Sequence, residues 1–147
     1  MTLPTYGRQL IRFAETFYVK PSLQVNSYRV VVLDTPLTSP SMPLHVKMGN
    51  GAAVGISQFQ VADNDPATGF ATDELRTLTV ATSGLLLVQA DSSLVTADVG
   101  TALYATAAGI ATDSLTVGGA AVTINGATPT IREIVSIGET PYVLISI

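Results

Sequence analysis

The close spacing of turn residues constrains this sequence more than any other feature. From residue 23 onward, short apolar and β-branched runs alternate with clusters of glycine, proline, asparagine and serine, at intervals of roughly 8 to 12 residues. A chain of 147 residues divided in this way has room for many short strands and none for long helices. The sequence therefore predicts an all-β fold, a compact barrel or sandwich of short antiparallel strands.

Several of the expected strands are paired by recognisable turns. The strongest signal is Asn50-Gly51, which lies between the runs 44–48 and 52–61 and is typical of a two-residue hairpin. Further hairpins are expected at Ser83-Gly84, Ala107-Ala108-Gly109, Gly118-Gly119 and residues 138–141. The three prolines within residues 35–43 exclude that stretch from a central ladder, so it is expected to be a loop.

Residues 6–18 fit two structures. Leu10, Phe13, Ala14 and Phe17 are spaced as one face of a helix would be. An extended arm fits the same residues nearly as well. We therefore expect an N-terminal arm or short helix ahead of the strands.

Charge divides the chain better than any linker does. Residues 1–48 hold five basic and two acidic residues, a net charge of +3, whereas the remainder carries −7. This asymmetry predicts an N-terminal arm or subdomain with a proline-rich loop over residues 1–48 and a β-barrel-like domain over residues 49–147. The candidate contact residues of the arm are basic or aromatic: Arg8, Arg12, Phe13, Phe17, Lys20 and Arg29.

Composition excludes several kinds of site and partner. The chain has no cysteine and one histidine, which rules out disulfides, thiolate-bound metals and paired imidazole ligands. A net charge of −4 argues against nucleic acid, because phosphate binding needs clustered lysine and arginine. Arg8 and Arg12 stand in a start that lacks a long apolar run, so neither a signal peptide nor a membrane span is expected. The sequence predicts a soluble chain made in the cytoplasm.

No set of residues indicates catalysis. His45 alternates with Val46 along an expected strand, which favours a solvent-facing or interface histidine over a general base. No serine occupies a G-x-S-x-G turn. Asp34-Thr35-Pro36 is superficially similar to an aspartic-protease loop but lacks its glycine and a second copy. We therefore expect no enzyme.

Two loops with possible ligand chemistry have simpler interpretations. The glycines of residues 49–55 precede an expected strand and not a helix, so a hairpin is favoured over a dinucleotide loop. Acidic residues Asp63, Asp65 and Glu74 stand at positions 1, 3 and 12 of a hypothetical calcium loop, but Thr68 replaces the required glycine. An acidic surface loop is favoured over a calcium site, and no cofactor is expected.

A phrase of glycine, leucine-tyrosine and glycine stands at Gly100, Leu103, Tyr104 and Gly109. It resembles a phrase of the family of small capsid decoration, or cement, proteins of tailed bacteriophages. The runs 51–56, 134–138 and 142–147 are similar to its opening and closing strands. The likeness extends over residues 49–147, whereas residues 1–48 are an addition that compact members lack.

The resemblance implies a trimer that sits on the outside of an icosahedral shell at local three-fold positions and has no catalytic activity. Its partners would be the major capsid protein and copies of itself, and its place would be the surface of the virion. A surface depleted of charge suits such contacts, because few ions lose their hydration. A fibre or adhesin module that binds a surface glycan remains the alternative, although aromatic platforms are scarce and tryptophan is absent.

Overall fold

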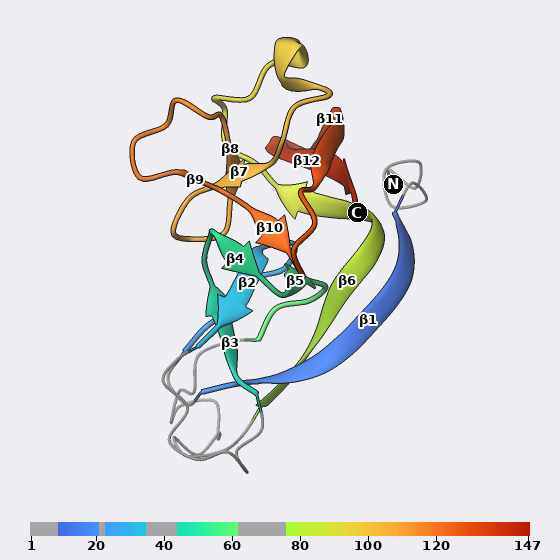
Figure 1. Cartoon of the computed structure of the whole chain (residues 1–147), viewed down its shortest axis with the longest axis vertical. Coiled ribbons are helices and arrows are strands. Elements are labelled where there is room, and N and C mark those ends of the chain that lie inside the picture. Colours follow the sequence, from blue (N-terminus) through green and yellow to red (C-terminus); the bar gives the residue numbers. More distant parts are fainter. Residues whose placement is uncertain (1–8, 21–22, 35–43, 62–75) are drawn as a thin grey trace.

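The computed structural model describes residues 9–20, 23–34, 44–61 and 76–147. Within these ranges the chain is built from strands and one three-residue 3-10 turn, Thr96–Asp98 (Figure 1), so the all-β prediction is confirmed. The strands are β1 (Leu10–Val19), β2 (Val30–Leu33), β3 (Val46–Met48), β4 (Ala52–Ala53), β5 (Gly55–Ser57), β6 (Arg76–Gln89), β7 (Tyr104–Ala105), β8 (Ala111–Thr112), β9 (Ala120–Ala121), β10 (Thr123–Ile124), β11 (Thr130–Ile137) and β12 (Thr140–Ser146).

Most of the longer strands belong to one antiparallel sheet. Its order is β11-β12-β6-β5-β2-β3, and β1 also pairs with β6. Two smaller sheets, β8-β7-β9 and the parallel pair β10-β4, lie beside it (Figure 1). The described strands leave the main sheet open, so it is not a closed barrel.

Strand β6 is the spine of the main sheet. Leu85 pairs with Leu10 of β1 and with Ser146 of β12, so these two strands lie on opposite edges of β6. Strand β5 lies on the same edge of β6 as β12 does, and it pairs there with Val80 and Ala81. The hairpin expected at Ser83-Gly84 is wrong: β6 runs through both residues because it is paired on both edges there.

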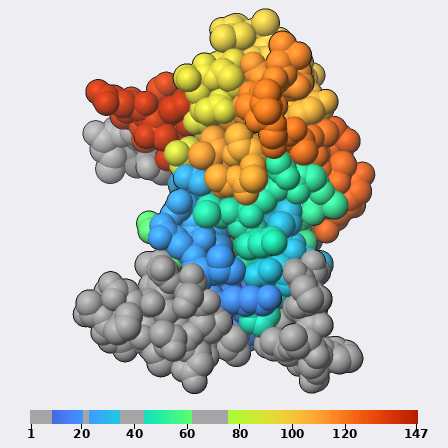
Figure 2. Space-filling model, turned by 90° about the vertical axis from the view of Figure 1, so that its left-hand side faces the viewer, coloured from blue at the N-terminus to red at the C-terminus, as the bar shows by residue number. Residues whose placement is uncertain are grey.

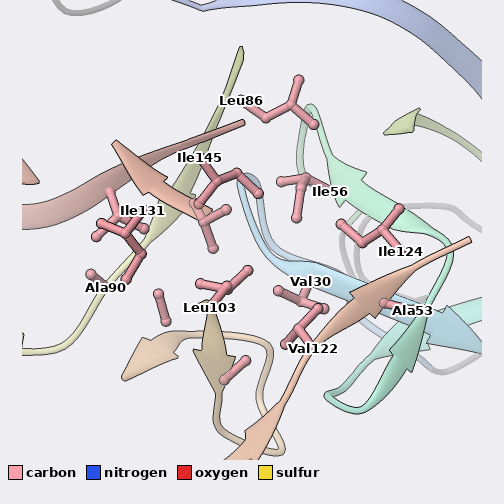
Figure 3. Packing of buried hydrophobic residues seen from close by; sticks show 14 of the residues in the cluster. Val30, Ala53, Ile56, Leu86, Ala90, Leu103, Val122, Ile124, Ile131 and Ile145 are labelled. Atoms are coloured by element: carbon pink, nitrogen blue, oxygen red, sulfur yellow. The ribbon is translucent and has the colours of Figure 1, made fainter. Parts of the chain in front are cut away.

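Two hydrophobic clusters lie on opposite sides of the central strands. The first joins the main sheet to the small sheets, with Ile56 and Ile145 packed in the same interior as Leu103 and Ile124 (Figure 3). The second lies under β1, β2, β3 and β6. In β2, successive residues alternate between them, as expected for a strand: Val30 belongs to the first cluster and Val31 to the second.

Two of the other expected hairpins are confirmed. Strands β7 and β8 pair about residues 106–110, and β11 and β12 pair about Gly138-Glu139. The hairpin at Asn50-Gly51 is wrong, because β3 pairs with β2 while β4 pairs with β10. Gly51 still turns the chain with a φ of 77°, but long-range pairing separates the strands that follow. Residues 115–117 are also no strand, and Val117 is fully exposed.

The helical alternative for residues 6–18 is wrong over its described part, where β1 forms instead. A lone helix of this length is marginal in water, whereas β1 gains a paired edge along β6 and buries Phe17 and Val19. The loop expected at 35–43 and the acidic stretch at 63–74 lie outside the described residues. Strands from before residue 48 share the main sheet with strands that follow it, and the division at that residue stays a prediction.

Gly109 provides a test of how the small sheet is attached. It has a φ of 75°, its carbonyl accepts the Val30 N–H at 2.9 Å, and an added Cβ would collide with the Val30 carbonyl oxygen. Gly118 has a similar φ of 84° with open space around it. We expect Gly109→Ala to lower the free energy of unfolding by about 2 to 5 kcal/mol, since backbone strain and a clash add.

The matched control is Gly118→Ala, which should cost about 1 to 2 kcal/mol from backbone strain alone. Urea denaturation of both variants measures the difference. Equal losses would contradict the close approach of the Gly109 turn to β2.

Candidate docking surface on the first strand

The first half of β1 is exposed although it is a paired strand. Residues 10–16 are all exposed, whereas Phe17 and Val19 are buried. Strand β6 pairs with one edge of β1, and no other described strand pairs with residues 10–16. An open strand edge presents unpaired N–H and C=O groups to other chains. This half of β1 is therefore available for contact.

Large apolar side chains occupy this exposed half. Leu10 is 63% exposed, Ile11 41% and Phe13 68%. Leu10 and Arg12 line a groove of about 230 Å³, to which Leu85 and Ile147 also contribute. We call Leu10, Ile11, Phe13 and this groove the β1 surface. Exposed apolar side chains that gather next to a groove are typical of interaction sites in soluble proteins.

The backbone beneath the β1 surface is held in place. The Gln9 side chain accepts a hydrogen bond from the Leu87 N–H at 3.0 Å and donates one to the Gln58 side chain at 2.9 Å. At Gly84, where φ is 126°, the β1 backbone approaches so closely that an added Cβ would collide with the Leu10 carbonyl. The exposed side chains thus project from a fixed strand.

The structure separates the expected arm residues into two groups. Arg12 and Phe13 are exposed neighbours on β1. Phe17 is buried in the second cluster. Lys20 lies 3.6 Å from the Asp34 carboxylate, which Lys47 also approaches at 3.9 Å. Arg8 lies outside the described residues.

Arg29, the last of the expected arm residues, is buried inside the fold. Its guanidinium donates hydrogen bonds to the Gln89 side chain at 3.2 Å and to the Ala108 carbonyl at 3.0 Å. Burial lowers the pKa of Arg29, and electrostatic interaction with Tyr142 partly offsets that effect. The side chain links β6 to the turn that follows β7. In the isolated chain it therefore stabilises the fold and is not exposed for contact with a partner.

His45 is buried, and the expectation that it faces solvent is wrong. Its side chain is 1% exposed, and its ring centroid lies 6.2 Å from that of Tyr18. Alternation with Val46 failed as a guide because both residues are buried: Val46 belongs to the second cluster, and the His45 ring lies beside that of Tyr18.

Sequence reasoning missed the residues that complete the β1 surface. The sequence predicts a possible helix face for Leu10 and separate hairpins for Leu85 and Ile147. Only the pairing of β6 with both β1 and β12 brings these residues together. Their apolar character was visible in the sequence, but their proximity depends on long-range pairing.

The described ranges also limit other kinds of site. Within them, no group of three or more histidine, aspartate or glutamate side chains is placed to hold a metal ion. None of the helical segments in those ranges is long and apolar enough to cross a membrane.

The fold is similar to that of a solved phage protein. The N base of the head fibre protein gp8.5 of bacteriophage phi29 superposes with a TM-score of 0.52 at 14% sequence identity, covering 91% of this chain and 95% of that one. No protein-family model matches the chain, and no curated protein sequence matches it. At this identity the likeness shows a shared fold, and it extends over nearly the whole length.

Phe13 and Phe17 provide a test that separates the exposed from the packed part of β1. We expect Phe17→Ala to lower the free energy of unfolding by about 3 to 5 kcal/mol, because it leaves a cavity in a buried cluster. Phe13→Ala should change it by less than about 0.5 kcal/mol in the isolated chain. Urea denaturation at low protein concentration measures both, and a large loss for Phe13→Ala would show that its ring packs within the fold.

Proposed function

We propose that the chain is a structural protein of a bacteriophage head. It binds the outer surface of the icosahedral shell, where the major capsid protein is its partner, and it stabilises that shell as a decoration or cement protein. It acts as a homotrimer at local three-fold positions, is made in the host cytoplasm and has no catalytic activity.

The observation that carries this proposal is the likeness to the base of a phage head fibre along nearly the whole chain. That protein belongs to a phage head by its name, and the fold it shares with this chain is an all-β body. The resemblance of residues 100–109 to a phrase of the capsid decoration proteins supports the same class of protein.

The β1 surface supports attachment to another protein. Its apolar side chains are exposed on a fixed strand, and Arg12 stands among them. Few ions must lose their hydration in this contact, because Arg12 is the one charged residue among those that line the groove. We assign Arg12 and Phe13 to the contact with the shell, and Phe17 and Arg29 to the fold that holds the contact in place.

Stabilisation follows from binding alone. A protein present at about 1,000 times its dissociation constant stabilises the state that it binds by about 4 kcal/mol. A trimer engages several symmetric sites at once, which raises its overall affinity without a new kind of contact. Stabilisation by binding needs no chemical step. His45 is buried, and its Nδ1 atom has no hydrogen-bond partner among the described residues.

Shell binding can be tested with point substitutions on the β1 surface. Phe13→Asp and Arg12→Glu should each lower occupancy on the shells of the virus that encodes the chain at least tenfold, because each places an unpaired carboxylate in the contact. Co-sedimentation with expanded and unexpanded shells measures occupancy. We expect the unaltered chain to bind expanded shells more tightly than unexpanded ones. Deletion of residues 1–20 is a poorer test, because Phe17 and Val19 belong to a buried cluster.

The matched control is Val117→Asp, which places the same carboxylate at a fully exposed apolar position outside the β1 surface. It should leave occupancy unchanged. Full occupancy by Phe13→Asp and Arg12→Glu would remove the β1 surface from the contact, and no binding of the unaltered chain to either shell would reject the decoration role.

The trimer has its own test. Light scattering of the purified chain should give three times the 15.3 kDa mass of one copy. A stable monomer that still saturates shells would reject the trimer and leave shell binding intact.

A further inference from the structure

The loops of residues 92–119 form one end of the molecule (Figures 1 and 2). Residues from these loops line a second concave site. It is a pocket of about 280 Å³, and it shares no residue with the β1 surface. Most of the residues that line it are polar, two of them acidic and four bearing hydroxyls: Asp98, Asp113, Thr101, Tyr104, Thr112 and Ser114. A concave site in which several polar groups converge is the usual form of a small-molecule site.

Hydrogen bonds from the protein fix both carboxylates. Asp98 accepts the Val95 N–H at 2.8 Å through Oδ2. Asp113 accepts the Leu115 N–H at 3.1 Å and the Thr116 hydroxyl at 2.8 Å, both through Oδ1. Within the described ranges, the second oxygen of each carboxylate receives no hydrogen bond. Each is thus free to accept one from a ligand.

The wall behind Asp113 is also fixed before any ligand arrives. The Ser93 hydroxyl lies 3.1 Å from that of Thr112 and accepts the Asp113 N–H at 3.0 Å. Burial would raise the pKa of Asp91, but hydrogen bonds from Ser93 and Thr112 outweigh it and lower that pKa. A preformed wall lowers the entropy that binding must overcome.

The charge of the pocket limits what can bind. Two carboxylates and no basic residue line it, so phosphate, carboxylate and sialic-acid groups would be repelled. Within the described ranges, no third acidic or imidazole side chain joins these two carboxylates in a group that could hold a metal ion. A protonated amine could donate to both carboxylates and to the hydroxyl oxygens, but as a donor only it could accept no hydrogen bond from a hydroxyl of the pocket.

A sugar uses all of these groups. Its hydroxyls both donate and accept, as those of threonine, serine and tyrosine do. Leu94, Ala102 and Tyr104 line the pocket as well, and apolar and aromatic residues of this kind can contact the C–H face of a pyranose. We propose that this pocket binds one residue of a neutral saccharide, with Asp98 and Asp113 accepting hydrogen bonds from its hydroxyls.

This site gives the chain a second function that does not depend on the first. A protein attached through the β1 surface can present the pocket to a surface glycan, and a chain that binds no shell can still bind the sugar. Failure of the shell-binding test therefore leaves the saccharide site standing, and the reverse also holds.

The test is a titration of the full-length, ¹⁵N-labelled chain with glucose, galactose, mannose and N-acetylglucosamine, followed by amide chemical shifts. At least one sugar should shift the amides of Thr101, Tyr104 and Ser114 in a saturable way. Asp98→Asn and Asp113→Asn should each weaken that binding roughly ten- to hundredfold, because each replaces a charged acceptor of a hydrogen bond. Glu139→Gln makes the same change at an exposed position in the β11–β12 turn and should leave binding unchanged.

Ser114→Tyr is a second variant that fills the exposed rim of the pocket and leaves both carboxylates in place. It should abolish the shifts even if an aspartate variant fails to fold. No saturable shift at the pocket with any of the four sugars would overturn the proposal. Shifts caused only by calcium chloride or butylamine would identify a cation site and would also overturn the proposal. Equal sugar affinity in Glu139→Gln, Asp98→Asn and Asp113→Asn would overturn it as well.

Discussion

The pairing of β6 on both of its edges is the constraint on which the rest of the structure depends. Strand β1 occupies one edge, while β5 and β12 share the other. Gly84 makes this possible, because a side chain at that position would meet the backbone of β1. One strand of 14 residues therefore joins segments from the start, the middle and the end of the chain.

The two buried clusters explain how a small domain keeps two surfaces free for other tasks. The central strands have apolar residues on both faces, as Val30 and Val31 show in β2. The fold is therefore stabilised from within, and the first half of β1 need not contribute large apolar side chains to it. Residues 92–119 supply Leu94 and Leu103 to the first cluster and leave other apolar side chains, such as Val117, exposed. Leu10, Phe13 and Val117 can remain exposed without loss of a core contact.

The sequence predicted the fold class and the local turns, and it failed where distant segments decide. The turns at Gly109 and Gly138 were predicted because each needs a positive φ that glycine supplies locally. Gly51 gave the same signal, yet its flanking strands pair elsewhere. Of the candidate arm residues, Arg12 and Phe13 are exposed, whereas Phe17 and Arg29 are buried. The register of β1 on β6 and the packing of β2 decide which of these side chains are buried. The pocket was missed because its aspartates are 15 residues apart in turns whose proximity depends on the β7–β8 pairing.

Arg29 connects the main sheet to the small sheet β8-β7-β9. It stands just before β2, and its side chain reaches Gln89 at the end of β6 and Ala108 in the turn between β7 and β8. Its own N–H donates to the Ser57 hydroxyl in β5. A buried guanidinium is costly unless its donors are used, so these contacts position the small sheet against the main one. Because β1 is fixed on β6 and Tyr104 of the pocket lies in β7, the same contacts set the direction in which the pocket faces relative to the β1 surface.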